Sequence, residues 1–88
     1  MRPGATLEVM QEQSSRLNSA FGQVIRDARA KAGWTQEQLA HRASLHRTYV
    51  GDLENGRKSP TLAVVDALAT ALGVKAHELI RAAEERVS

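Results

Sequence analysis

Residues 33–56 read GWTQEQLAHRASLHRTYVGDLENG, and the spacing of their polar and apolar residues predicts two short helices. Thr35 is followed three residues later by Gln38, a spacing that forms a capping box at the start of a helix. A short turn at 44–45 separates this helix from a second one, which is expected over 47–55. Two short helices joined by a tight turn predict a helix-turn-helix unit.

Three further helices are expected around this unit. The first is expected to begin at Asn18 or Ser19, since either residue can cap a helix, and to end at Ala32. Ser59 as the cap, with Pro60 at the first helical position, predicts the start of the fourth helix. The fifth is expected at the C-terminal end of the chain.

Apolar residues recur at helical spacing and indicate the faces turned to the core. They are Phe21, Val24, Ile25 and Ala28 in the first helix, Leu39, Ala40 and Ala43 in the second, Val50 and Leu53 in the third, Leu62, Val65, Leu68, Ala69 and Leu72 in the fourth, and Leu79, Ile80 and Ala83 in the fifth, over 76–85. Val74 is expected to fill the core between the last two helices. No strand pattern appears, so we predict an all-α, compact five-helix domain.

The length of 88 residues suits one domain. Residues 1–17 are expected to form an N-terminal extension, partly disordered or helical, because Pro3, Gly4 and a polar run interrupt its apolar pattern. Residues 18–88 then make up the folded domain. A domain of this size buries a modest core, so association with a second copy is expected.

Several function classes are not expected from this composition. The absence of cysteine excludes disulfides and thiolate metal sites, and the spacing of His41, His46 and His77 forms no helical metal pair. Neither metal nor cofactor is therefore expected. Since no nucleophile–base grouping or glycine-rich phosphate loop is visible, an enzyme is not expected either. No apolar run approaches the roughly 18–20 residues of a membrane span, and a secretion signal is missing, so a cytoplasmic location is expected.

Positive charge gathers in the middle of the chain. The whole chain carries a formal charge of +2, but residues 26–58 hold seven basic and four acidic residues, a net charge of +3. A polyanion would therefore bind this part of the chain.

The expected third helix presents a polar side that can enter a major groove. Val50 and Leu53 point inward, whereas Arg47 and Thr48 point outward at the N-terminal end, the part that reaches base edges in this docking mode. Arginine can bond guanine O6 and N7 together. Gly51 lies on the same outward side, either to let the backbone approach DNA closely or as a tolerated surface glycine.

The chain resembles the lambda-repressor-like, or XRE, helix-turn-helix family of DNA-binding transcriptional regulators. The resemblance rests on the strings GWTQEQLA and LHRTYVGDLENG of residues 33–56, on SPTL at 59–62 and on ATALGV at 69–74, and it covers about residues 19–82. The run Leu-His-Arg-Thr-Tyr at 45–49 is most similar to the controller proteins of restriction–modification systems.

The resemblance implies roles for individual positions. It implies that Arg47, Thr48 and Asp52 occupy the base-reading positions. For Asp52 three roles are open: it accepts a hydrogen bond from cytosine, holds Arg47 in place, or repels wrong sequences. Phosphate contacts are implied for Gln36, which also braces the recognition helix, and for Asn55, Arg57 and Lys58. Apart from the resemblance, His46 lies near the turn and either touches a phosphate or caps the third helix, and Tyr49 points its hydroxyl at a phosphate or only packs on the core. Arg29 and Glu54 form a structural ion pair.

The partners implied are double-stranded DNA and a second copy of the chain. In the fifth helix, Leu79 is assigned to the core and Ile80 and Ala83 to the homodimer interface. A two-fold dimer would place two recognition helices about 34 Å apart, one DNA turn, and would read a partly palindromic operator. A second protein partner is the alternative, because domains of this family also occur as antitoxins.

Overall fold

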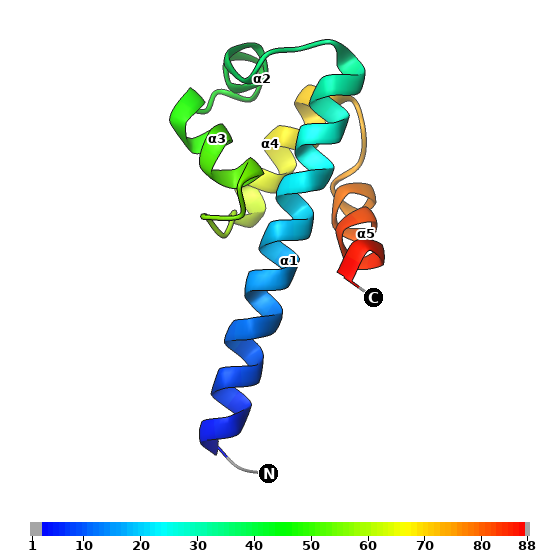
Figure 1. Ribbon diagram of the computed structural model, residues 1–88. Coiled ribbons are helices and arrows are strands. Elements are labelled where there is room, and N and C mark those ends of the chain that lie inside the picture. Colours follow the sequence, from blue (N-terminus) through cyan, green and yellow to red (C-terminus); the bar gives the residue numbers. More distant parts are fainter. Residues whose placement is uncertain (1–2, 88) are drawn as a thin grey trace.

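Five helices make up the part of the chain that the structure describes (Figure 1). The computed structural model describes residues 3–87, with side chains described from residue 15 onward. The helices are α1 (Pro3–Ala32), α2 (Gln36–Ala43), α3 (Arg47–Glu54), α4 (Leu62–Leu72) and α5 (Ala76–Val87). Within this described range no strand is present, so the all-α prediction is confirmed.

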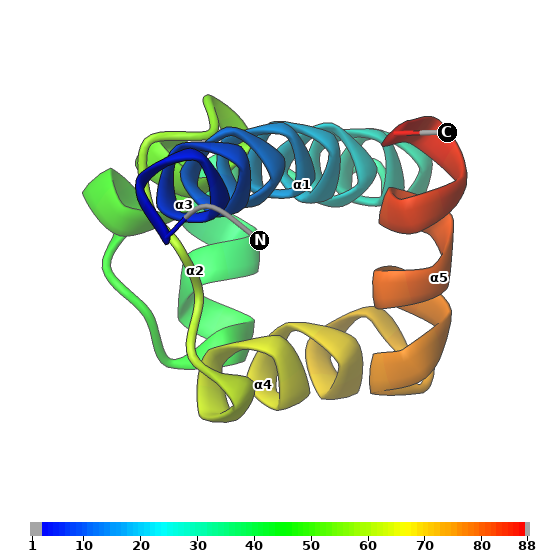
Figure 2. The ribbon, with the colours of Figure 1, turned by 90° about the horizontal axis from the view of Figure 1, so that it is seen from below.

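The arrangement of the helices places α2 and α3 at one end of the core. Figure 2 shows α1 and α4 on opposite sides, with α2 and α3 closing one end and α5 closing the other. The helix α1 packs against α3, α4 and α5, while α2 packs against α3 and α4. The helix-turn-helix pair and α5 therefore face away from each other across the same core.

The capping box predicted for α2 is confirmed. The Thr35 hydroxyl accepts from the Gln38 backbone N–H over 3.1 Å, and the Gln38 side chain accepts from the Thr35 N–H over 2.8 Å. At the other end Ser44 takes a left-handed conformation, with φ 56°, and its N–H closes the last turn. Capping at both ends holds this helix to eight residues.

Two helix starts differ from the prediction. The first helix begins at Pro3 rather than at Asn18 or Ser19, so the predicted extension continues α1 without a break, and its N-terminal half projects beyond the other helices in Figure 1. The fourth helix is capped by Thr61, whose hydroxyl accepts from the Val64 N–H over 3.2 Å, and not by Ser59. A residue before proline is driven to extended conformations, so Ser59 and Pro60 belong to the loop.

The core agrees with most of the predicted stripes, but Leu72 and Ile80 are only partly buried, and three further positions also differ. It consists of Ala20, Phe21, Val24, Ile25, Leu39, Ala40, Ala43, Val50, Leu53, Val65, Leu68, Ala69, Leu79 and Ala83. Ala28 is only partly buried. Leu62 is 81% exposed and Val74 is 37% exposed, so neither fills the core as expected. Leu62 is the first residue of α4, and its side chain lies beyond the end of the buried stripe.

At Gly22 the backbone of α1 passes very close to the end of α3. A Cβ atom added there would lie 2.1 Å from the Leu53 carbonyl oxygen and 2.8 Å from that of Glu54. Only a residue without a side chain allows α1 to pass so near the C-terminal end of α3. This contact sets the position of α3 relative to the rest of the core.

Candidate nucleic-acid interface

The carboxylate of Glu54 joins three helices. It is 2% exposed, the one buried charged residue among the side chains that the structure describes. Arg29 of α1 donates from Nε to Oε2 over 2.7 Å and from Nη2 to Oε1 over 3.0 Å. Gln36, the first residue of α2, donates from Nε2 to Oε1 over 2.9 Å. The two helices of the helix-turn-helix unit are thus held to each other and to α1 by one group.

The pair of Arg29 and Glu54 is the one expected from the sequence. Its hydrogen bonds raise the pKa of Arg29 above the usual value, although burial opposes the charge. A further bond runs from Arg29 Nη1 to the Trp34 carbonyl oxygen over 2.8 Å and fixes the link between α1 and α2. Because the carboxylate is buried, removal of Arg29 would leave it only the more distant and half-exposed Arg26, whose Nε lies 3.8 Å from Glu54 Oε1.

Arg26 is a residue that the sequence analysis missed. Its Nη2 donates to the Glu54 carbonyl oxygen and to Asn55 Oδ1, each over 3.3 Å. Asn55 in turn donates from Nδ2 to the Gly51 carbonyl oxygen over 2.9 Å. The Asn55 side chain is therefore engaged in closing the end of α3. The signal in the sequence is that Arg26 precedes Arg29 by three residues and shares its side of the helix.

The outward side of α3 carries exposed polar groups. Arg47 has a side chain that is 62% exposed, and Thr48 beside it is exposed as well. Two arginines near this side have an acidic neighbour. Arg47 Nε lies 3.7 Å from Glu37 Oε1, and Arg57 Nη1 lies 3.8 Å from Asp52 Oδ1. One role left open for Asp52 was to hold Arg47. The structure does not show this contact, because the Asp52 carboxylate pairs with Arg57.

The remaining predicted contact residues surround α3. His46 precedes the helix at its N-cap position but makes no side-chain capping bond, so the capping alternative is wrong. Tyr49 is partly buried and packs against the core. Lys58 is exposed in the loop that follows α3. An added Cβ at Gly51 would meet only the Gln36 amide, at an ordinary contact distance of 3.8 Å.

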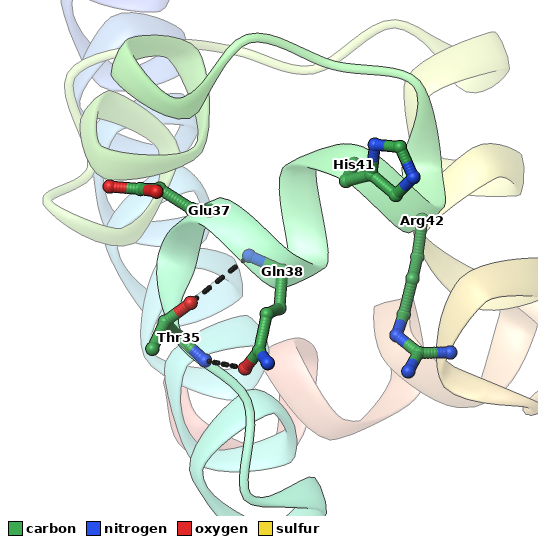
Figure 3. A pocket seen from close by; sticks show the side chains of 5 residues that line it. All are labelled: Thr35, Glu37, Gln38, His41 and Arg42. Atoms are coloured by element: carbon green, nitrogen blue, oxygen red, sulfur yellow. Dashed lines mark hydrogen bonds between the residues drawn. The ribbon is translucent and has the colours of Figure 1, made fainter.

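The exposed side of α2 borders this region. Figure 3 shows a hollow lined by Thr35, Glu37, Gln38, His41 and Arg42, in which Glu37 points away from Arg42. Arg42 lies over the ring of Trp34 at 4.3 Å from its centre, a cation–π contact that orders this edge. No group of acidic and histidine side chains in the described part of the chain could hold a metal ion.

Ala83 and Ile80, the two positions assigned to a dimer interface, differ in burial. Ala83 is fully buried at 0% exposure, so its side chain faces the core and is not available to a partner. A small residue fits there because α5 packs closely on α1. Ile80 is only partly buried and borders a surface groove together with Leu62 and Leu17.

Together, the capped α2, the tight turn and the exposed side of α3 define a helix-turn-helix DNA-binding transcriptional regulator. The chain belongs to the lambda-repressor-like, or XRE, branch of the helix-turn-helix family, whose family model, HTH_3, described as Helix-turn-helix, matches residues 25–79. The family predicted from the sequence is thereby confirmed. None of the described helices is long and apolar enough to cross a membrane.

Known relatives agree with this assignment. The chain is 38% identical over 80 residues to the "Neisseria hypothetical transcription factor" of Neisseria meningitidis serogroup B, a match that covers 91% of this chain and 74% of that protein. It is 39% identical over 61 residues to "Control protein C.BamHI" of Bacillus amyloliquefaciens, with 68% of this chain and 75% of that protein covered. The solved structure of the restriction-modification controller protein C.AhdI from Aeromonas hydrophila superposes with a TM-score of 0.69 at 40% identity and covers 70% of this chain and 94% of that one.

Proposed function

We propose that the chain inserts α3 into the major groove of a specific duplex and reads bases with Arg47 and Thr48. The observation that carries this proposal is the exposure of both side chains at the N-terminal end of a helix whose other side is locked to the core. The buried Glu54 holds α3 to α1 and α2, so the reading groups stand on a rigid support.

Contacts with phosphate are proposed for groups on either side of α3. Lys58 and Arg57 are exposed in the loop that follows the helix, and His46 precedes it. Gln36 uses one amide hydrogen on Glu54 and keeps the other for a phosphate oxygen. Such contacts fix the position of the protein on the duplex but carry no sequence information. For Asp52 we propose the role of holding Arg57 toward the backbone.

A homodimer is proposed to bind a partly palindromic operator. Its interface is the groove beside α5, where Leu62 is 81% exposed and Leu17 is 37% exposed next to the partly buried Ile80. A two-fold interface requires a protrusion and a recess on the same surface. Leu62 supplies the protrusion, and the groove lined by Phe21 and Ile80 supplies the recess. This surface replaces the sequence-based choice of Ala83.

The experiment that tests the function is a binding titration followed by fluorescence anisotropy. The duplex upstream of the chain's own gene and a scrambled duplex of the same composition are compared at several salt concentrations. Specific recognition predicts binding at least about 10³-fold tighter to the first duplex at physiological salt. Equal affinities with the same steep salt dependence for both duplexes, and for every duplex selected from a random library, would contradict base reading.

A further inference from the structure

We infer that Glu37 is a specificity-determining residue, which holds Arg47 in the orientation that suits a guanine and opposes its use on a phosphate. This inference rests on the proposed function, because it concerns how α3 distinguishes one duplex from another. The observation behind it is the ion pair that links the first turn of α2 to the first residue of α3.

The pair lies at the edge where the two helices meet. Glu37 Oε1 is 3.7 Å from Arg47 Nε, and the two side chains are 78% and 62% exposed. Glu37 is not needed to cap α2, since Thr35 and Gln38 already bond the backbone at that end. Figure 3 shows Glu37 directed away from the other side chains of the hollow. Its carboxylate is thus free to act on Arg47 at the proposed DNA surface.

The atom that is engaged matters for recognition. An arginine side chain has one donor at Nε and two at each terminal nitrogen. A carboxylate beside Nε leaves both terminal nitrogens of Arg47 to face guanine O6 and N7 in parallel. By contrast, the Asp52 carboxylate lies 3.8 Å from a terminal nitrogen of Arg57, at the end of that side chain and not beside its Nε.

The negative charge of Glu37 also acts against wrong partners. If Arg47 turned to a phosphate, it would leave Glu37 or bring that carboxylate close to the phosphate oxygens. Like charges that are brought together oppose association, and such repulsion discriminates between targets without any added attraction. On a duplex without the matching guanine, Glu37 therefore weakens binding. On the matching duplex, Arg47 stays paired with Glu37 while it bonds the guanine.

The pair itself contributes little to folding, because exposed ion pairs are weak. Its effect is expected in the discrimination ratio, which is the affinity for a matching duplex divided by the affinity for a scrambled one. From the strength of a single charge near a phosphate, we expect Glu37→Gln to tighten binding to the scrambled duplex by about three- to tenfold. Binding to the matching duplex should change by less than about twofold.

The test uses the full chain and two duplexes of equal length: one selected by the wild-type chain from a random library, and one scrambled. Asp66→Asn is the matched control, because it removes the same charge from an exposed position on α4. We expect Glu37→Gln to lower the discrimination ratio about three- to tenfold and Asp66→Asn to leave the ratio unchanged. Thermal unfolding of each variant confirms that equal amounts of folded protein are compared.

A second background separates the action on Arg47 from a general charge effect. In an Arg47→Ala chain, Glu37→Gln should shift both affinities by the same factor and leave the remaining ratio unchanged. The inference is overturned if Glu37→Gln shifts both duplexes equally in the wild-type background, or if it lowers the ratio equally well without Arg47. If the wild-type chain prefers no selected duplex, the proposed function itself fails and this inference fails with it.

Discussion

Replacement of Gly22 by alanine tests the packing that positions α3. The added Cβ would lie 2.1 Å from the Leu53 carbonyl oxygen, and 2.8 Å and 2.9 Å from the carbonyl oxygen and carbon of Glu54. A carbon and an oxygen atom normally approach to about 3.3 Å, so the gap must widen by roughly 1.2 Å. All three atoms belong to the backbone, and therefore no side-chain rotation can relieve the contact.

Three contributions set the expected change in the free energy of unfolding for Gly22→Ala. Alanine is favoured over glycine inside a helix by about 0.5–1 kcal/mol. Overpacking of a close contact costs about 1–3 kcal/mol. Movement of α3 also strains the 2.7 Å bond between Arg29 and the buried Glu54, and complete loss of that pair would cost about 3–5 kcal/mol. With partial loss we expect Gly22→Ala to lower the free energy of unfolding by about 2–4 kcal/mol, which lowers Tm by roughly 10–25 °C.

Gly51→Ala is the matched control in this experiment. It makes the same chemical change in a helix, but the added Cβ would meet nothing closer than 3.8 Å. We therefore expect Gly51→Ala to raise the free energy of unfolding, by about 0.5–1 kcal/mol. Urea unfolding followed by circular dichroism and by Trp34 fluorescence measures both variants. If Gly22→Ala is as stable as the wild-type chain, α1 does not pack on the backbone of α3 as closely as described.

Three further predictions concern the buried pair, a helix cap and the dimer. Arg29→Ala should destabilise the fold by about 3–5 kcal/mol. The pKa of Arg29 is raised in the fold, so the stability that its charge contributes is fully present below the unfolded pKa and is lost only as pH rises through the higher folded value. The decrease in the free energy of unfolding caused by Arg29→Ala should therefore be equal in unfolding curves at about pH 6 and pH 9. Thr61→Ala should cost about 1 kcal/mol, whereas Ser59→Ala should stay within about 0.5 kcal/mol in the same unfolding assay; equal costs would contradict the cap at Thr61. Leu62→Asp should give monomers in sedimentation at concentrations at which the wild-type chain forms dimers, with the helical content retained; a dimer that persists would exclude this surface.

Local signals in the sequence were sufficient for the helix-turn-helix unit. The capping box of Thr35 and Gln38 depends on residues three positions apart, and it forms as predicted. The buried stripe of α3, formed by Val50 and Leu53, follows from helical spacing alone. These features could be predicted because each depends on residues within one or two helical turns.

The two helix starts that were predicted wrongly, those of α4 and α1, also have local causes. Ser59 and Thr61 are both acceptable caps, and the proline between them fits either a helix start or the loop before it. Only the path that the chain takes after α3 favours Thr61. The start of α1 was also missed, because the polar run before residue 18 interrupts the apolar pattern, whereas a helix that continues beyond the core needs no apolar stripe there.

Local patterns in the sequence were enough to predict the helix-turn-helix unit and the outward side of Arg47 and Thr48, and the resemblance to the family implied the pairing of Arg29 with Glu54. Which groups meet across helices follows from the three-dimensional packing and from no local pattern. This packing brings Gly22 against the end of α3, places Arg26 on the same carbonyl group, pairs Arg47 with Glu37, and leaves Leu62 in solvent. The physical reason is that such contacts depend on how near two helices pass and how each is rotated. Helical periodicity specifies which side of a helix is buried, but not which atom of another helix lies opposite.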